Sequence, residues 1–144
     1  MDYHRNLREV VIEASEANEW MSAKEEWEVC DMEIGEDGIC KCGKTGLVYL
    51  YTIRNTINNT TLFPIGSSCI NQFNNDDMTD QMKILDMGDK VLEHGKYNGL
   101  TYREIFISHR DYLEWLDENY HGSKHKRKSN QYNSLIKYYY CKIK

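Results

Sequence analysis

Apolar residues recur every three or four positions between Leu7 and Ala17, which is the spacing of an amphipathic helix. Ser22 and Glu25 are spaced as a capping box, so a second short helix or turn is expected before Trp27. The opposite face of the first helix would be acidic, because it carries Glu9, Glu13, Glu16 and Glu19.

The middle of the chain changes to short segments with a β pattern. Residues 26–34 alternate between polar and apolar side chains, and residues 47–55 and 61–65 are rich in β-branched and aromatic side chains. Pro64 suits the end of a strand or a sheet edge. A short helix is expected over residues 66–73, since serine precedes an apolar run there. This region is therefore predicted to be a small antiparallel sheet framed by short helices.

A polar break at residues 74–82 is the predicted module boundary. Beyond it, the pattern predicts helices near residues 79–92 and 109–120 and, over residues 132–144, a terminal helix or strand. Asn98 and Gly99 predict a turn, and Thr101 with Glu104 a capping box. The predicted fold class is α+β, with a helix-plus-sheet module over 1–75, a mostly helical module over 76–120 and a basic aromatic tail over 121–144.

The net charge of -5 conceals a segregation of charge along the chain. Residues 1–37 carry a net charge of -9, residues 38–75 of +3, residues 76–120 of -6 and residues 121–144 of +7. This pattern fits either a solvated acidic helix face with a disordered basic tail, or surfaces that bind partners.

No stretch of the chain has the apolar length of a membrane span, and the charged N-terminus does not resemble a secretory signal. We therefore expect the protein to stay in the cytoplasm of the cell that makes it. We also expect it to be a monomer.

Five cysteines are an odd number for a chain without an export signal, which favours reduced thiols or a metal site over disulfides. Two of them are separated by one residue in a glycine-rich loop, where Gly38, Gly43 and Gly46 allow a tight turn around an ion. Structural zinc takes four ligands, and thiolates are its common partners. The predicted zinc ligands are Cys30, Cys40, Cys42 and Cys69.

Cys30 is open to a second interpretation, as a small buried residue on a strand. In that case His4, Asp37, a water molecule or Cys141 would complete the coordination. A closed thiolate site has no open position for a substrate, so the zinc is expected to be structural.

Residues 40–73 resemble a zinc-binding segment of phage and large-virus proteins, in which a C-x-C-G turn precedes a strand ending in I-x-N and a G-S-x-C-I step. Relatives often place a histidine or a further cysteine where this chain has Lys44 and Tyr51. That departure is a second reason to consider Cys30. The matching residues are Cys40, Cys42, Gly43, Ile53, Asn55, Gly66, Ser67, Cys69 and Ile70.

Residues 94–116 resemble the small C-terminal module of exonuclease-X-type nucleases, which implies association with nucleic acid. The chain departs from the pattern at His94 and Asn98, and it lacks the acidic metal-binding core of those nucleases. The matching residues are Gly95, Lys96, Tyr97, Gly99, Thr101, Tyr112, Leu113, Trp115 and Leu116.

Catalytic groups are not suggested by the sequence: Asp76 and Asp77 lie in a polar break, His94 and His109 are isolated, and no glycine-rich phosphate loop is present. We expect a protein that is not an enzyme.

As a class, the chain resembles zinc-containing anti-CRISPR proteins of phages that act on type II systems. The resemblance implies a DNA-mimicking inhibitor that acts in the cytoplasm of a host bacterial cell, where it binds the effector nuclease and prevents loading of target DNA. For such an inhibitor, nucleic acid would be only a secondary partner. The alternative is a non-catalytic nucleic-acid-binding accessory module that uses the basic tail and the zinc turn. The candidate partner-binding residues are Glu9, Glu13, Glu16, Glu19, Lys124, Lys126, Arg127 and Lys128.

Overall fold

The computed structural model describes residues 2–119 and 126–143, with side chains placed for 2–119 and 131–143. It has the predicted α+β class, with one three-stranded antiparallel sheet among helices. The chain divides into two compact units, residues 1–83 and 84–144. Within the described part, no helix combines the length and the hydropathy needed to cross a bilayer.

The boundary between the two units falls inside α4 (Asp76–Asp86), later along the chain than the predicted boundary after residue 75. The C-terminal segment is not a separate part. It forms α7 (Lys126–Ile143), which belongs to the second unit. Two units therefore replace the three predicted parts.

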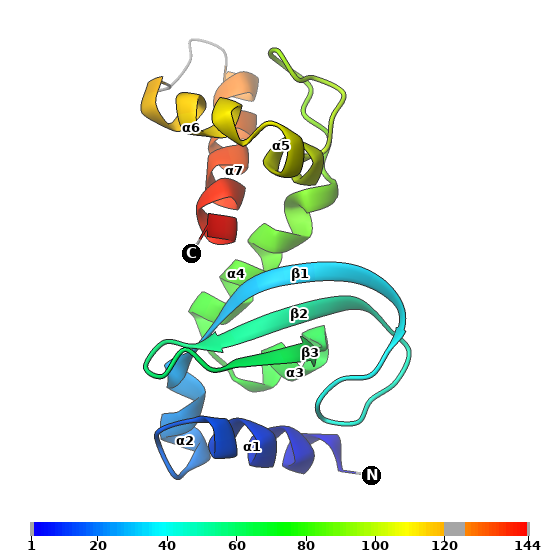
Figure 1. Cartoon of the computed structure of the whole chain (residues 1–144), viewed down its shortest axis with the longest axis vertical. Coiled ribbons are helices and arrows are strands. Elements are labelled where there is room, and N and C mark those ends of the chain that lie inside the picture. The colour runs from blue at the N-terminus through cyan, green and yellow to red at the C-terminus, as the bar shows by residue number, and fades with distance from the viewer. Residues whose placement is uncertain (1, 120–125, 144) are drawn as a thin grey trace. The chain divides into compact units, whose positions relative to one another are not determined.

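The sheet of the first unit consists of β1 (Trp27–Gly38), β2 (Leu47–Asn55) and β3 (Thr61–Ile65), in that order (Figure 1). The pairing of β1 with β2 is interrupted after Val29, which lies opposite Ile53, while Asp31 lies opposite Thr52. Cys30 is therefore the extra residue of a β-bulge.

The first unit also contains α1 (Tyr3–Ala14), α2 (Trp20–Ala23), α3 (Ser67–Gln72) and the part of α4 up to Lys83, with a 3-10 turn at Lys24–Glu26. Leu7 and Val11 of α1 are fully buried, as the helical spacing predicts. The core between helices and sheet also contains Val29, Tyr51, Ile53, Ile65, Ile70, Phe73 and Met78.

The predicted acidic helix face is only partly correct, because α1 ends before two of its four glutamates. Ser15 is extended, and its hydroxyl accepts a hydrogen bond of 2.8 Å from the Trp27 indole nitrogen. Glu9 and Glu13 lie on α1, whereas Glu16 and Glu19 lie in the connection to α2. The four side chains are all exposed, but they do not share one helix.

Glu26 is a buried carboxylate that joins three segments of the first unit. It accepts hydrogen bonds from the backbone amides of Glu16 and Ala17 at 2.8 and 2.9 Å, and from the side-chain nitrogen of Asn55 at 3.0 Å. Burial alone would raise the pKa of the Glu26 carboxyl, but these donors together hold its pKa below the ordinary value. The carboxylate thus fixes the connection after α1 to the end of β2.

The second unit is helical, with α5 (Tyr102–Ser108), α6 (Arg110–Asn119) and α7 around one apolar core, and a 3-10 turn at Met87–Asp89. The predicted capping box is confirmed: the Thr101 hydroxyl accepts from the Glu104 amide at 3.1 Å. The core comprises Leu92, Tyr102, Ile105, Phe106, Leu113, Leu116, Leu135, Tyr138 and Tyr139. Three of these residues come from α7, so the tail tyrosines Tyr138 and Tyr139 are core residues.

Candidate metal centre and aromatic cavity

Cys40 and Cys42 lie in a tight turn between β1 and β2. The Cys40 amide donates to the Lys44 carbonyl at 2.9 Å, and the Gly43 amide donates to the Cys40 carbonyl at 2.8 Å. Gly43 has a φ of 100°, a conformation that glycine adopts without steric cost. The turn is held against β3 by the Lys41 amide, which donates to the Pro64 carbonyl at 3.0 Å.

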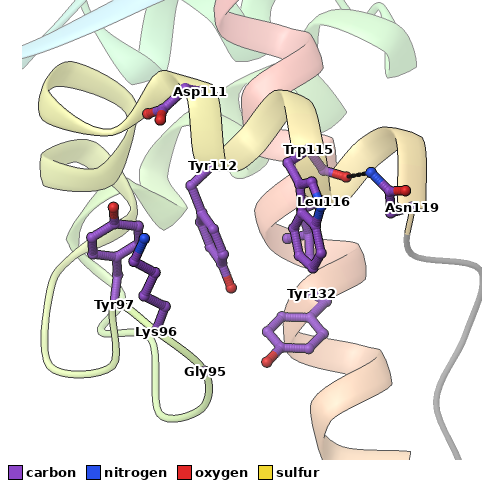
Figure 2. Close-up of a pocket in the computed structure, with 9 residues that line it drawn as sticks. All are labelled: Gly95, Lys96, Tyr97, Asp111, Tyr112, Trp115, Leu116, Asn119 and Tyr132. Carbon is purple, nitrogen blue, oxygen red and sulfur yellow. Dashed lines mark hydrogen bonds between the residues drawn. The ribbon is translucent and has the colours of Figure 1, made fainter.

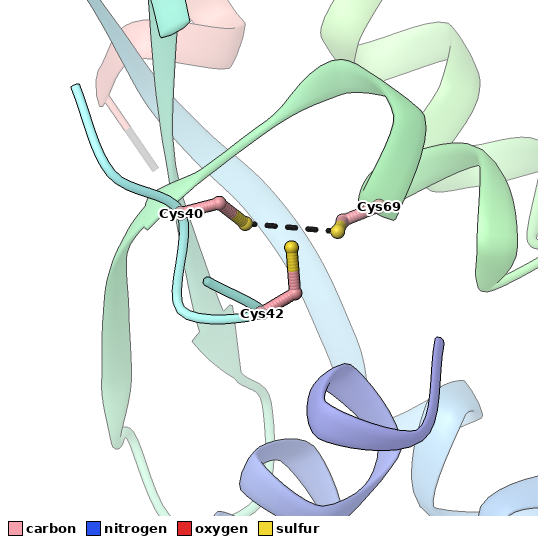
Figure 3. A group of neighbouring side chains, drawn as sticks. All are labelled: Cys40, Cys42 and Cys69. Atoms are coloured by element: carbon pink, nitrogen blue, oxygen red, sulfur yellow. Dashed lines mark hydrogen bonds between the residues drawn. The ribbon is translucent and has the colours of Figure 1, made fainter. Parts of the chain in front are cut away.

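The turn and the first residues of α3 bring three cysteines together. Cys40, Cys42 and Cys69 are buried, and their sulfur atoms all lie within 4.8 Å of one another (Figure 3). The Cys40 and Cys69 sulfurs are 3.6 Å apart. These three residues, predicted from the sequence to act together, lie close enough to hold a metal ion.

The surroundings of Cys40 favour a thiolate. Contact with the Cys69 thiol lowers the pKa of Cys40, against the effect of burial, and the amides of Cys42 and Gly66 lower it further. The Gly66 amide lies 3.3 Å from the Cys40 sulfur and donates to it. The pKa of Cys69 is raised in turn, by the same contact and by burial. The cluster therefore already favours negative charge on one sulfur, which is the form that binds metals.

Cys30, the predicted fourth ligand, is not part of this cluster. It occupies the bulge of β1, half-buried, with its thiol 3.6 Å from the Thr52 carbonyl oxygen. Burial raises the pKa of the Cys30 thiol. The second interpretation of Cys30, as a packed strand residue, describes its position in the structure. Two residues considered in its place also lie elsewhere: Asp37 is exposed on β1, and Cys141 is buried in the second unit.

A cavity of about 600 Å³ opens in the second unit, and six of its nine lining residues are among those that resemble the nuclease module (Figure 2). Tyr97 lies on one side, Trp115 and Tyr132 on the other, and Tyr112 between them. The rings of Tyr112 and Trp115 are nearly parallel, with an interplanar angle of 20° and centroids 6.0 Å apart. The remaining lining residues are Gly95, Lys96, Asp111, Leu116 and Asn119.

The floor of the cavity depends on Gly95. Its φ is 87°, and an added Cβ would lie 2.7 Å from the Tyr132 hydroxyl oxygen and 3.0 Å from that of Tyr112. Another residue there would be strained by the positive φ and would push both hydroxyls from their places. Burial, together with the neighbouring Tyr132, raises the pKa of Tyr112 to about 12, so the Tyr112 phenol is neutral at physiological pH.

The cavity edge carries charge of both signs. The Lys96 ammonium lies 5.4 Å from the centroid of the Tyr97 ring, and Asp111 lies at the start of α6. The basic residues predicted to bind a partner come after α6 in the sequence. Lys124 lies outside the described residues, and so do the side chains of Lys126, Arg127 and Lys128.

Sequence reasoning did not identify the cavity. Its aromatic residues come from three segments, at 95–97, at 111–119 and at Tyr132. The packing of α7 on α6 and the contact of the Tyr97 ring with Tyr112, at 4.9 Å between centroids, bring these segments together. Comparison of the chain with protein-family models, with curated proteins and with solved structures finds no match in any of the three.

Proposed function

We propose that this protein is a non-catalytic, zinc-stabilised module that binds single-stranded nucleic acid in the aromatic cavity of its second unit. The observation that carries the proposal is the cavity itself, with four aromatic side chains around a volume of about 600 Å³. Small-ligand sites typically occupy roughly 300–1,000 Å³ and are mostly apolar, with a few polar groups.

Zinc is the proposed metal because its preferred ligands are thiolates in a tetrahedron. Two thiolates bound to one zinc at about 2.3 Å lie about 3.8 Å apart, from tetrahedral geometry. The Cys40 and Cys69 sulfurs, at 3.6 Å, need almost no rearrangement to reach that spacing.

A nucleobase is the proposed occupant because it has a flat π-face that stacks on tyrosine and tryptophan whatever the base. The Trp115 side chain is 56 % exposed at the cavity edge, where a base can reach it. Asp111 and Asn119 add hydrogen-bonding groups beside the rings.

The charge of the second unit fits this occupant. Residues 84–144 contain 11 basic and 8 acidic residues, a net charge of +3, whereas residues 1–83 contain 7 basic and 15 acidic residues, a net charge of -8. The basic run from Lys124 to Lys128 lies in sequence between Asn119 and Tyr132, which both line the cavity. Contact of this basic run with the phosphates next to a bound base is part of the proposal.

Replacing Trp115 by alanine is expected to weaken binding of a fluorescent oligothymidylate about tenfold, since stacking contributes about 1–3 kcal/mol per base. The measurement is fluorescence anisotropy of the full zinc-loaded chain at two salt concentrations. Tyr49→Ala is the matched control, because Tyr49 is an exposed aromatic residue of β2 outside the cavity. Native chain that does not bind the oligonucleotide, or equal affinities for the W115A variant and native chain, would refute the proposal.

A second function, inhibition of a type II RNA-guided nuclease, is favoured by the net charge of -8 on the first unit and by the exposure of its glutamates. Such a nuclease offers a positively charged channel to nucleic acid. Glu13 is exposed on α1, although Glu9 is paired with Arg5 at 3.2 Å. Steering by this charge would accelerate the encounter with the channel and so compete with target DNA.

If inhibition is the function, the double substitution Glu9→Lys and Glu13→Lys should slow association with the guide-loaded nuclease about tenfold, because steering depends on the sign of the surface charge. Surface plasmon resonance at moderate salt measures the rate. Glu118→Lys is the control, since it reverses a charge at an exposed site in the second unit. Absence of any association between the native chain and the nuclease would eliminate this function and leave the first proposal standing.

A further inference from the structure

The three clustered cysteines provide one donor fewer than a closed tetrahedral zinc site requires. The surroundings of their sulfurs therefore point to the residue that completes the site. A cavity of about 100 Å³ adjoins two of the three cysteines, Cys42 and Cys69. Its other lining residues include His4, Lys44, Ser68 and Gln72.

Among the side chains that line this cavity, the imidazole of His4 is the one whose chemistry matches structural zinc. Zinc binds histidine nitrogen at about 2.0–2.1 Å and is common in sites with three cysteines and one histidine. Lysine at neutral pH is a cation, and the amide of glutamine and the hydroxyl of serine are not among the common zinc ligands.

The backbone that carries His4 is held beside the metal turn. Asn6, two residues further along α1, donates from its side chain to the Cys42 carbonyl at 2.9 Å. Asp2 caps the same helix, and its carboxylate accepts from the Arg5 amide at 3.1 Å. The first turn of α1 is thus tied both to its cap and to the cysteine turn, with His4 between the two contacts. The His4 imidazole is exposed and is not in the group of ligand atoms within 4.8 Å of one another, so it must turn toward the sulfurs to coordinate an ion.

We propose that His4 is the fourth zinc ligand, which makes the site a Cys3His centre formed by the start of α1, the 40–42 turn and α3. This inference rests on the zinc site of the proposed function and assigns its remaining ligand. The metal then ties α1 to the sheet, and coordination fixes the N-terminal helix in place. A ligand on α1 also makes the folding of that helix dependent on the metal.

The test uses the full chain loaded with cadmium-113, a spectroscopic substitute for zinc. A scalar coupling between cadmium and the imidazole ring protons of His4 is the expected NMR result, and its absence would overturn the assignment. His4→Gln is expected to lower zinc affinity about tenfold or more, since even residues that only orient a ligand contribute 10–100-fold. A chelator competition assay measures that affinity.

His94→Gln is the matched control, because His94 lies in the second unit. It should leave both the zinc affinity and the cadmium spectrum unchanged. Equal zinc affinities for the H4Q variant and native chain would show that another group completes the site. Native chain that binds no metal would overturn the zinc proposal together with this one, whereas failure to bind oligonucleotide would affect neither.

Discussion

Removing the metal is expected to unfold the first unit and leave the second unit folded. Structural zinc contributes roughly 10 kcal/mol of apparent folding free energy at neutral pH, comparable to the whole stability of a small domain. The proposed ligands Cys40, Cys42 and Cys69 all lie in the first unit. NMR of the full chain before and after chelation distinguishes the units: the Trp27 indole signal should collapse and the Trp115 signal should persist.

A single-cysteine comparison sharpens this prediction. Cys69→Ser should reproduce the effect of the chelator, because serine is a poor replacement for a thiolate ligand. Cys30→Ser is the matched control: Cys30 is half-buried in the bulge of β1 and outside the cluster, so the variant should retain one metal ion per chain. A metal-free chain that kept the Trp27 signal would show that the metal is not structural, and loss of the ion in C30S would show that the assigned cluster is wrong.

Replacing Glu26 by alanine is expected to lower the free energy of unfolding of the first unit by about 3–5 kcal/mol. The substitution leaves three donors without their partner, on Glu16, Ala17 and Asn55, and each unsatisfied buried group costs about 1–3 kcal/mol. Urea denaturation of the metal-loaded chain measures the change. Glu25→Ala is the control, because the exposed carboxylate of Glu25 makes only a 3.8 Å ion pair with Lys24, worth at most about 1 kcal/mol. A loss for E26A no larger than for E25A would contradict the role of Glu26.

The contribution of Glu26 to the stability of the first unit is expected to fall as the pH is lowered. The pKa of Glu26 is lowered in the folded chain from an ordinary value of 4.5, so its contribution is fully present above pH 4.5 and is lost as the pH falls through the lower folded value. The difference in stability between native chain and Glu26→Gln should therefore shrink over that range. Comparing the two at equal pH cancels the loss of metal that acid also causes. A difference that stays constant down to about pH 3 would contradict this linkage.

The sequence correctly predicted those strands, helix caps and turns whose conformation depends mainly on neighbouring residues. The β-branched run at 47–55 is a strand, the capping box at Thr101 begins α5, and the glycine after Cys42 adopts the positive φ that a tight metal turn requires. Cys40 and Cys42 are held together by that turn alone, and the strand and return strand then place Cys69 beside them.

Cys30 was not predictable in the same way. Whether a strand residue points toward a metal or away from it depends on register, and one extra residue reverses it. The bulge after Val29 is visible only in the pairing of β1 with β2. Likewise, α1 ends at Ala14 because Ser15 and Glu26 make contacts with segments distant in the sequence. The helical spacing of apolar residues does not predict such contacts.

The sequence therefore determines the fold class, the strands and the clustering of the three cysteines, since local conformation and the alternation of polar and apolar residues specify them. The residues that stand beside those cysteines follow only from the folded arrangement. The cavity joins Gly95, Trp115 and Tyr132, and the cysteine cluster contacts the start of α1 through Asn6. Contacts across such distances along the chain depend on how helices and strands pack, and packing is a property of the whole folded unit.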